Sequence, residues 1–468
     1  ALMTGATLVN FSPLYTAREL EAQVADSGTR LLVTADVAAL LPTALEVLDA
    51  TQLETLVVAR FARQLPWYKG LALRLFDRKL CVGVPRRSDV VEWHEVLSRS
   101  QTTPVAIDPL HDLALLQYTG GTTGTPKGAM LTHQNLSANA RQLWVIDPDK
   151  GKRDMVMGVL PLFHVFANTC ALNRTVFNGG CIAMMPRFDA AQFLATAHRV
   201  QPTAMFAVPT MLQALLDYPG TAGTDFSSVR GCISGGAPLA LPLKQRFEAA
   251  TGIRVVEGYG LTESSGVVST NPLRADGKPG TIGQPVPGTR IRLLDKVDPT
   301  RDAAPGEPGE LAVQGPQVMQ GYWNRPEAAA SAFATRADGQ WLRTGDVAVL
   351  DADGYLAIVD RIKDMIAVGG FKVFPSQVED VLVQHPAVKE ALVIGVPHPR
   401  SGEVPRAYVT VRNAISGDEL REWLNDRVGK HERVDAVVVR DALPKTMIGK
   451  LDRKALREQV AQEQQTPR

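Results

Sequence analysis

The sequence predicts an α/β protein with a large N-terminal domain and a small α+β domain at its C-terminal end. A chain of 468 residues is too long for one ordinary domain. From residue 155 onward short apolar runs alternate with helical patterns, and after Pro272 glycine, proline and short strands become frequent. A separate block follows residue 362. We therefore expect a large domain over 1–362, with a β-rich subdomain at about 272–360, and a small domain over 363–468.

The alternating region predicts layered parallel sheets covered by helices, because strict alternation of strands and helices is typical of such sheets. Parallel sheets of this kind bind ligands beyond the carboxyl ends of their strands. Two turns, Gly235-Gly236-Ala237 and Gly258-Tyr259-Gly260, follow expected strands and so belong to that edge. The expected strands are 155–160, 181–185, 204–208, 231–234 and 253–257, and the expected helices are 164–177, 190–200, 210–217 and 239–251.

The remainder of the chain predicts shorter elements. In the β-rich subdomain we expect strands over 289–294, 309–313 and 355–359. In the small domain we expect a helix near 375–384, strands over 391–396 and 407–411, a helix over 417–428 and a charged tail.

Composition narrows the classes of function. Lysine plus arginine (50) nearly balances aspartate plus glutamate (49), so no global charge favours nucleic acid. The four cysteines are scattered without metal-ligand spacing, which is typical of a reduced protein inside the cell. No apolar run is long enough to span a membrane. We expect a cytoplasmic protein that can bury a large core.

The stretch from Tyr118 to Gly128 contains four glycines, four threonines and Lys127. Glycines let a ligand approach the backbone closely, and N–H groups with hydroxyls can surround phosphates. It is not a Walker A loop, because Gly-Lys-Ser/Thr is absent and Pro126 precedes the lysine. A flexible surface loop is the alternative. The residues expected to cradle phosphates are Thr119, Gly120, Gly121, Thr122, Thr123, Gly124 and Lys127.

A second motif runs from Glu257 to Glu263. An aromatic ring between two glycines, Tyr259, can lie on a flat base, while Thr262 suits a phosphate and Glu263 suits Mg²⁺. Taken alone, the same residues would make a turn with a solvated carboxylate.

Two further motifs lie toward the C-terminal end. Thr344-Gly345-Asp346 precedes Asp360-Arg361-Ile362-Lys363-Asp364, and in isolation these would be a β-turn and a solvated run of charges. Lys450 follows Pro444-Lys445-Thr446 and Gly449, and in isolation it would be one of several lysines on a basic C-terminal helix.

Together and in this order, the motifs resemble those of the adenylate-forming superfamily, which contains acyl-CoA synthetases, peptide-synthetase adenylation domains and luciferases. The resemblance implies that Tyr259 stacks on adenine, Thr262 contacts the α-phosphate and Glu263 holds Mg²⁺. Asp346 would bind the ribose, Arg361 would reach the ribose or a phosphate, and Lys450 would polarise the substrate carboxylate and the α-phosphate. The remaining residues expected around the nucleotide are Gly235, Gly236, Ala237, Glu257, Gly258 and Gly260.

The resemblance implies two half-reactions. A carboxylate attacks the α-phosphate of Mg·ATP to give an acyl-adenylate and pyrophosphate, and the thiol of CoA then attacks the acyl carbon, releasing AMP. Lys363 would be the hinge about which the small domain rotates between the two steps. That rotation would replace Lys450 by Gly369, Gly370 and Phe371, which would line the CoA tunnel.

The acid is indicated by weaker signals. The segment Leu160 to Phe166 resembles an acyl pocket with His164 beside the reacting carboxylate, although a lone histidine on an apolar helix is often a core residue. Overall the sequence resembles bacterial long-chain fatty acyl-CoA synthetases, which implies a fatty acid, ATP and CoA as substrates. A ligase for a medium-chain or aryl acid, an adenylation enzyme that loads a carrier protein, and a non-catalytic acyl-nucleotide binder are the alternatives.

Residues 61–87 interleave apolar and aromatic side chains with lysine and arginine. Such a stretch can lie peripherally on the inner face of a membrane, or it can form a helix that packs on the large domain. A long acyl tail also needs an apolar tunnel, for which Ala167, Ala171 and Gly236 leave room. The resemblance allows a homodimer, and it indicates that the chain lacks the N-terminal portion of the family.

Overall fold

A computed structural model gives the fold, and it divides the chain into two compact units. Ala1–His133 with Gln320–Pro326 form the first unit, and Gln134–Met319 with Glu327–Arg468 form the second. No helix in the described part of the chain is long and apolar enough to cross a membrane. The structure describes residues 1–76, 79–98, 103–119, 126–149, 151–274, 277–296, 298–369, 371–446 and 449–465.

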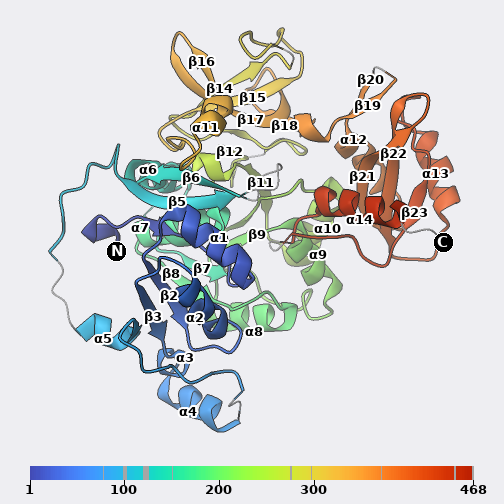
Figure 1. The fold of residues 1–468 in the computed structure, drawn as a ribbon. Coiled ribbons are helices and arrows are strands. Elements are labelled where there is room, and N and C mark those ends of the chain that lie inside the picture. Colours follow the sequence, from blue (N-terminus) through green and yellow to red (C-terminus); the bar gives the residue numbers. More distant parts are fainter. Residues whose placement is uncertain are drawn as a thin grey trace. The chain divides into compact units, whose positions relative to one another are not determined.

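The first unit contains two three-stranded sheets, with strand orders β1-β5-β6 and β2-β3-β4 (Figure 1). Helix α1 begins at a capping box made by Thr16 and Glu19, and its Leu20 and Val24 pack in one cluster with Leu56. The elements are β1 (Leu8–Val9), α1 (Ala17–Ser27), β2 (Leu31–Ala35), α2 (Leu41–Ala50), β3 (Thr55–Ala59), α3 (Phe61–Gln64), α4 (Trp67–Phe76), β4 (Val90–Glu92), α5 (Trp93–Ser98), β5 (Leu113–Thr119) and β6 (Lys127–Thr132).

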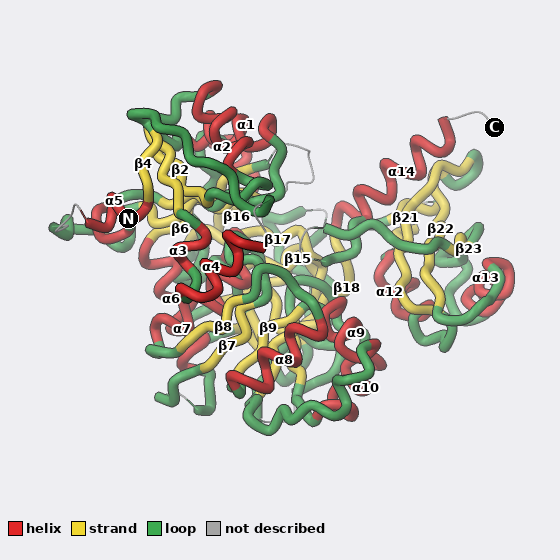
Figure 2. The backbone as a smooth tube through the Cα atoms, turned by 90° about the horizontal axis from the view of Figure 1, so that it is seen from below, coloured by secondary structure: helices red, strands yellow, loops and turns green. Residues whose placement is uncertain are grey.

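The second unit is built on a seven-stranded sheet with the order β13-β12-β11-β10-β9-β7-β8. Figure 2 shows three of its neighbouring strands, β8, β7 and β9. Strands β7 to β11 pair in parallel, as the alternating pattern predicts, and two antiparallel strands are added beside β11. The elements are α6 (His133–Val145), β7 (Met155–Gly158), β8 (Cys181–Met184), α8 (Ala190–Val200), β9 (Ala204–Ala207), α9 (Pro209–Asp217), β10 (Gly231–Ser234), α10 (Leu241–Thr251), β11 (Val255–Tyr259), β12 (Ser269–Thr270) and β13 (Gln284–Pro285).

One expected helix of this sheet differs from the prediction. In place of a single α-helix over 164–177, the structure has a π-helix over Ala167–Asn173, followed by α7 (Arg174–Phe177). His164 stands just before the helical turns, and its carbonyl accepts the N–H of Asn168 at 2.9 Å. The apolar pattern located the segment, but a π-helix has no separate sequence signal in a window this short.

The β-rich part of the second unit is an antiparallel five-stranded sheet in the range where glycine and proline become frequent. Strand β17 is long and pairs with β15, β16 and β18. The elements are β14 (Arg290–Leu294), β15 (Gly309–Gln314), α11 (Pro326–Ala332), β16 (Phe333–Arg336), β17 (Gly339–Leu350) and β18 (Leu356–Arg361).

The last block has its own five-stranded sheet and its own apolar core, which includes Val378, Val393, Val409 and Leu420. The expected charged tail is largely a helix, because Leu456 and Val460 bury one face of it against the sheet. The elements are β19 (Ile366–Val368), β20 (Phe371–Val373), α12 (Pro375–Leu382), β21 (Val388–His398), β22 (Gly402–Val411), α13 (Gly417–Asn425), β23 (Val437–Val439) and α14 (Arg453–Gln465). We call residues 363–468 the small domain.

Candidate active site

The carboxyl edge of the seven-stranded sheet gathers several expected site residues. The chain leaves β10 through Gly235 and Gly236, and Gly236 has φ +82°, a conformation that favours glycine. It leaves β11 through Gly260, where an added Cβ would lie only 2.1 Å from the carbonyl oxygen of Gly266. Both turns therefore depend on glycine. A small pocket lies between the segment that follows β7 and the chain just after β9 and β10, and it is lined by Leu160, Pro161, His164, Phe166, Ala167, Val208 and Gly236.

His164 is held as a neutral imidazole in this pocket. Its Nδ1 accepts the backbone N–H of Phe166 at 3.3 Å, so the ring proton belongs on Nε2. Burial, and to a lesser extent the positive charge of Lys450, lower the pKa of His164 to about 4. The side chain is therefore a hydrogen-bond donor through Nε2 at neutral pH and not a cation.

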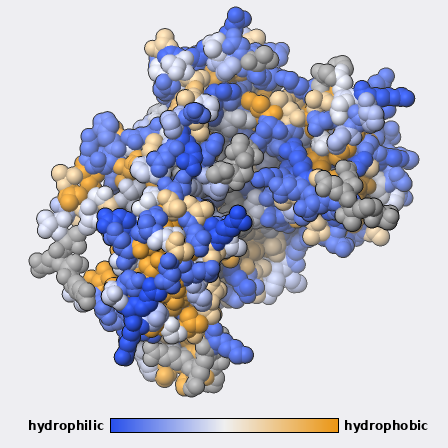
Figure 3. Space-filling model, viewed as in Figure 1, coloured by the Kyte–Doolittle hydropathy of each residue, from blue (hydrophilic) through white to orange (hydrophobic). Residues whose placement is uncertain are grey.

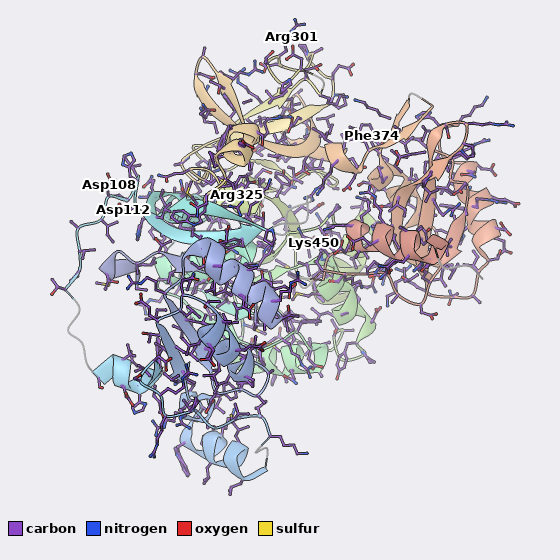
Figure 4. The ribbon with its side chains drawn as sticks, in the orientation of Figure 1. Asp108, Asp112, Arg301, Arg325, Phe374 and Lys450 are labelled. Atoms are coloured by element: carbon purple, nitrogen blue, oxygen red, sulfur yellow. The ribbon has the colours of Figure 1, made fainter. Side chains whose placement is uncertain are left out.

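Lys450 reaches the same pocket from the small domain (Figure 4). A Cβ built on Gly236 would lie 3.1 Å from Cε and 3.8 Å from Nζ of Lys450. Thr446 fixes the lysine backbone, because its Oγ1 accepts the N–H of Lys450 at 3.2 Å and its own N–H donates to the Lys450 carbonyl at 2.7 Å. Burial, followed by the charge of Arg361, lowers the pKa of Lys450 to about 8.

Asp346 joins two other expected nucleotide residues. Its Oδ1 accepts the Nε–H of Arg361 at 2.9 Å, and its Oδ2 accepts the hydroxyl of Tyr259. Burial, followed by the charge of Asp346, raises the pKa of Tyr259, so the phenol stays protonated. Because a carboxylate has about four lone-pair sites, Asp346 keeps acceptor capacity for further hydrogen-bond donors.

Of the ordinary interpretations of the two C-terminal motifs, the β-turn is wrong, and the solvated charge run fits Arg361 and Lys363 but not the aspartates. Thr344-Gly345-Asp346 is not a β-turn but an irregular stretch inside β17, where the pairing with β15 shifts register and Gly345 has φ +74°. Bulges of this kind re-aim side chains next to binding sites. Asp360 and Asp364 are buried and are not part of a solvated charge run.

The run from Glu257 to Glu263 begins in β11 and ends in a short 3₁₀ turn over Thr262–Ser264. Burial raises the pKa of Glu257 to about 7, although its carboxylate accepts the N–H of Leu239 at 3.3 Å. The backbone of Glu263 is tied to Met319, whose N–H donates to the Glu263 carbonyl at 2.8 Å. No group of three or more histidine, cysteine or acidic residues within the described ranges is arranged to hold a metal ion by itself.

The expected phosphate loop belongs to the first unit. It connects two antiparallel strands, with Thr119 at the end of β5 opposite Lys127 at the start of β6. The Lys127 ammonium lies 5.4 Å from the centre of the Tyr322 ring. Gly120, Gly121, Thr122, Thr123 and Gly124 lie outside the described residues.

The expected hinge and CoA loop lie where the chain passes from one sheet to the next. Lys363 is in a short 3₁₀ turn, Ile362–Asp364, between β18 of the β-rich sheet and β19 of the small domain. Gly369 follows β19 with φ +56°, and Phe371 begins β20. Gly370 lies outside the described residues.

The sequence analysis overlooked one group of residues near the site. Thr210, at the start of α9, faces Gly449 just before the expected catalytic lysine, and Asp217 at the end of α9 pairs with Lys389 of the small domain. Thr210 follows β9 as Gly235 follows β10, so the rule about carboxyl ends of strands could have identified it. The ion pair has no sequence signal, because its partners are far apart in the chain.

Comparisons with known proteins identify the family of the chain. Residues 1–323 match the AMP-binding enzyme family, and residues 377–450 match the C-terminal domain of AMP-binding enzymes. A long-chain-fatty-acid–CoA ligase of Bacillus subtilis (strain 168) is 37% identical over 466 residues, which cover 98% of this chain and 82% of the relative. A feruloyl-CoA synthase of an Amycolatopsis species is 40% identical over 351 residues, covering 74% of this chain and 69% of the relative.

A solved structure shares the fold. The anthranilate CoA ligase AuaEII in complex with anthranoyl-AMP superposes with a TM-score of 0.82 at 27% identity, covering 99% of this chain and 84% of that one. The predicted α/β class is thus confirmed. ATP and CoA fit the family as substrates. The chain belongs to the AMP-binding enzyme family and is an adenylate-forming acyl-CoA ligase.

Proposed function

We propose that this enzyme is a long-chain fatty acid–CoA ligase, which activates the acid as an acyl-adenylate and transfers the acyl group to CoA. The Bacillus subtilis relative, which bears that name and aligns along nearly the whole chain, supports the choice of acid. The observation that carries the chemistry is the position of Lys450 beside His164 and Gly236 at an apolar pocket.

Lys450 and His164, at this pocket, have different roles in the first half-reaction. The carboxylate and the α-phosphate are both anionic, so a cation between them offsets their repulsion and stabilises the charge that builds on phosphorus. Lys450 supplies that cation. Neutral His164 donates from Nε2 to the substrate carboxylate and keeps it aimed out of the apolar pocket.

The nucleotide is held by residues on the two glycine turns and on the β-rich sheet. Tyr259 lies along the adenine, and Asp346 with Arg361 binds the ribose. Thr262 contacts the α-phosphate, and Thr119, Lys127 and the loop between them contact the other phosphates. Gly235, Gly236, Ala237, Glu257, Gly258 and Gly260 shape the walls of the nucleotide site.

Glu263 is the residue proposed to hold Mg²⁺. A single half-buried carboxylate fits this ion, because Mg²⁺ is usually bound through one or two carboxylates, water and the phosphates of the substrate. When bound, the ion neutralises phosphate charge.

For the second half-reaction we propose that the small domain, residues 363–468, turns about Lys363. The turn withdraws Lys450 and brings Gly369, Gly370 and Phe371 to the nucleotide, where they line the path of the CoA thiol. A large domain over 1–362, with its β-rich subdomain at about 272–360, stays fixed during this motion.

An aryl acid is the second candidate for the substrate. The 40% identity to the feruloyl-CoA synthase favours such an acid. The ring of Phe166 also favours it, because this ring lines the pocket and packs edge-on against Phe206, with the two ring centroids 6.3 Å apart. A flat aromatic acid could stack against the Phe166 ring, whereas a long acyl chain must extend past this ring toward Ala167 and Ala171.

CoA-dependent AMP formation with palmitate, octanoate, acetate and ferulate separates the candidates. Each buried CH₂ adds about 0.8 kcal/mol, so kcat/KM should rise several-fold for each added CH₂ until the tunnel is full. A preference for ferulate would transfer the assignment to an aryl acid. Pyrophosphate release without CoA consumption would indicate an enzyme that loads a carrier protein.

We also propose that helix α4 places the enzyme peripherally on the inner face of a membrane, where its substrate resides. Trp67 is 80% exposed, and Tyr68, Leu71 and Leu75 are each more than half exposed, which does not fit a helix packed on a domain. Figure 3 shows apolar side chains at this end of the first unit. Salt-sensitive sedimentation with anionic vesicles, lost in Trp67→Ala, would support the proposal.

Light scattering would test a homodimer.

A further inference from the structure

Helix α9 (Pro209–Asp217) contacts the small domain at both of its ends. At its first turn, Thr210 faces the loop that carries Lys450. A Cβ added to Gly449, which has φ +78°, would lie 2.8 Å from Thr210 Oγ1 and 3.8 Å from Val208 Cγ2. The absence of a side chain at Gly449 therefore lets the lysine loop lie directly on the start of α9.

At the other end of α9, Asp217 meets β21 of the small domain. Its Oδ2 lies 3.5 Å from the Lys389 ammonium, and its Oδ1 accepts the Nε2–H of Gln213 at 2.6 Å. Gln213 lies one turn earlier on the same helix and so fixes the direction in which the carboxylate points. Burial, followed by the charge of Arg246 on α10, lowers the pKa of Arg412 in the small domain, and the charge of Asp217 partly opposes this shift.

We propose that α9 is the docking element that holds the small domain in the adenylating arrangement, with Thr210 and Asp217 as positioning residues. This inference rests on the proposed role of Lys450 in adenylation. Thr210 and Asp217 are separated by about 10 Å along the helix, so together the two contacts fix both the position and the rotation of the small domain. A turn about Lys363 breaks both contacts, so α9 stabilises only the first half-reaction.

Charge reversal tests the Asp217 end. ATP–pyrophosphate exchange measures adenylation, and conversion of supplied palmitoyl-adenylate to palmitoyl-CoA measures the second step. An exposed ion pair has a small effect, so Asp217→Lys and Lys389→Asp should each slow adenylation roughly two- to fivefold while leaving the second step unchanged. The double variant, with the charges exchanged, should recover adenylation, and the losses should shrink at high salt.

A steric change tests the Thr210 end. Thr210→Leu places extra carbons where Gly449 docks, and it should slow adenylation more than charge reversal does, again without slowing the second step. Thr210→Ser keeps the hydroxyl and should retain most of the adenylation. Arg301→Asp is the control, because Arg301 and Asp298 form a more exposed pair at 3.2 Å on a loop remote from α9 (Figure 4).

The outcomes are distinct. Equal slowing of both half-reactions, or no slowing, in the α9 variants would overturn the docking proposal, as would failure of the charge exchange to restore adenylation. Lys450→Ala is run in parallel. If Lys450→Ala adenylates at the normal rate, the proposed function of Lys450 fails. If Lys450→Ala loses adenylation while the α9 variants keep it, only the proposed role of α9 fails.

Discussion

The two edges of the seven-stranded sheet differ in whether their buried ionisable side chains form ion pairs. At the amino edge, Asp154 and Arg230 directly precede β7 and β10 and bond to each other. Arg174, only 5% exposed, donates to Asp154 at 2.7 Å and also pairs with Asp147. Within the described residues, the buried charges of this edge thus meet opposite charges.

At the carboxyl edge, Lys450, His164 and Glu257 are largely buried and form no ion pair with any residue that the structure describes. Burial lowers the pKa of Lys450 to about 8 and of His164 to about 4, and it raises that of Glu257 to about 7. Each shift favours the uncharged form, because desolvation outweighs the opposite charges that act there, Asp346 on Lys450 and Lys244 on Glu257. Paired charges specify structure, whereas uncompensated ones in a pocket are typical of a site that awaits a charged ligand.

The largest effect that this comparison predicts is on stability, at the amino edge. Arg174→Met leaves Asp147 with only the longer contact to Arg230, at 3.9 Å, and deprives Asp154 of one of its two arginine partners. This change should lower the free energy of unfolding by about 3–5 kcal/mol. The kcat of the folded enzyme should change little. Urea denaturation with activity at low temperature measures both, and Arg301→Met, at an exposed pair, should change stability by less than about 1 kcal/mol. A fall in kcat with unchanged stability would reverse the assignment of the two edges.

The next effect is on rate, at the carboxyl edge. Lys450→Ala should slow adenylation by roughly 10²–10³, the usual consequence of losing one well-placed electrostatic contact to a transition state. Unfolding should be unaffected, and supplied acyl-adenylate should still yield acyl-CoA. Single-turnover assays of the two steps test this, and an equal loss in both would contradict rotation of the small domain.

Much of the fold of the second unit is predictable, because strand–helix alternation has a local signature. Strand β10 and helix α8 have the predicted bounds, and β7 and β9 end within two residues of prediction. The strands β12 and β13, of two residues each, have too little pattern to be seen. The contact of Tyr259 with Asp346 joins residues far apart in the chain, so only the folded structure reveals it.

The nucleotide side gives a smaller effect. Asp346→Ala removes the acceptor that Tyr259 and Arg361 share and that the ribose is proposed to use. A hydrogen bond to a charged group contributes about 1.5–3 kcal/mol, so KM for ATP should rise tenfold or more. Tyr259→Phe removes one hydrogen-bond donor to Asp346 but leaves the carboxylate, so this variant should raise KM for ATP less than Asp346→Ala does. An unchanged ATP dependence in Asp346→Ala would remove this residue from the site.

The smallest effect concerns pH. Lys450 acts as a cation, and its pKa of about 8 means that the charge is present below pH 8 and is lost as pH rises through that value. The kcat/KM for adenylation, which reports groups of the free enzyme, should therefore fall about twofold between pH 7 and 8 and more steeply above. His164, with a pKa of about 4, stays neutral over this range. Lys450→Arg should abolish the alkaline decline whatever its absolute rate, because a guanidinium remains charged. A decline that persists in Lys450→Arg would place the titrating group elsewhere and weaken the contrast between the two edges.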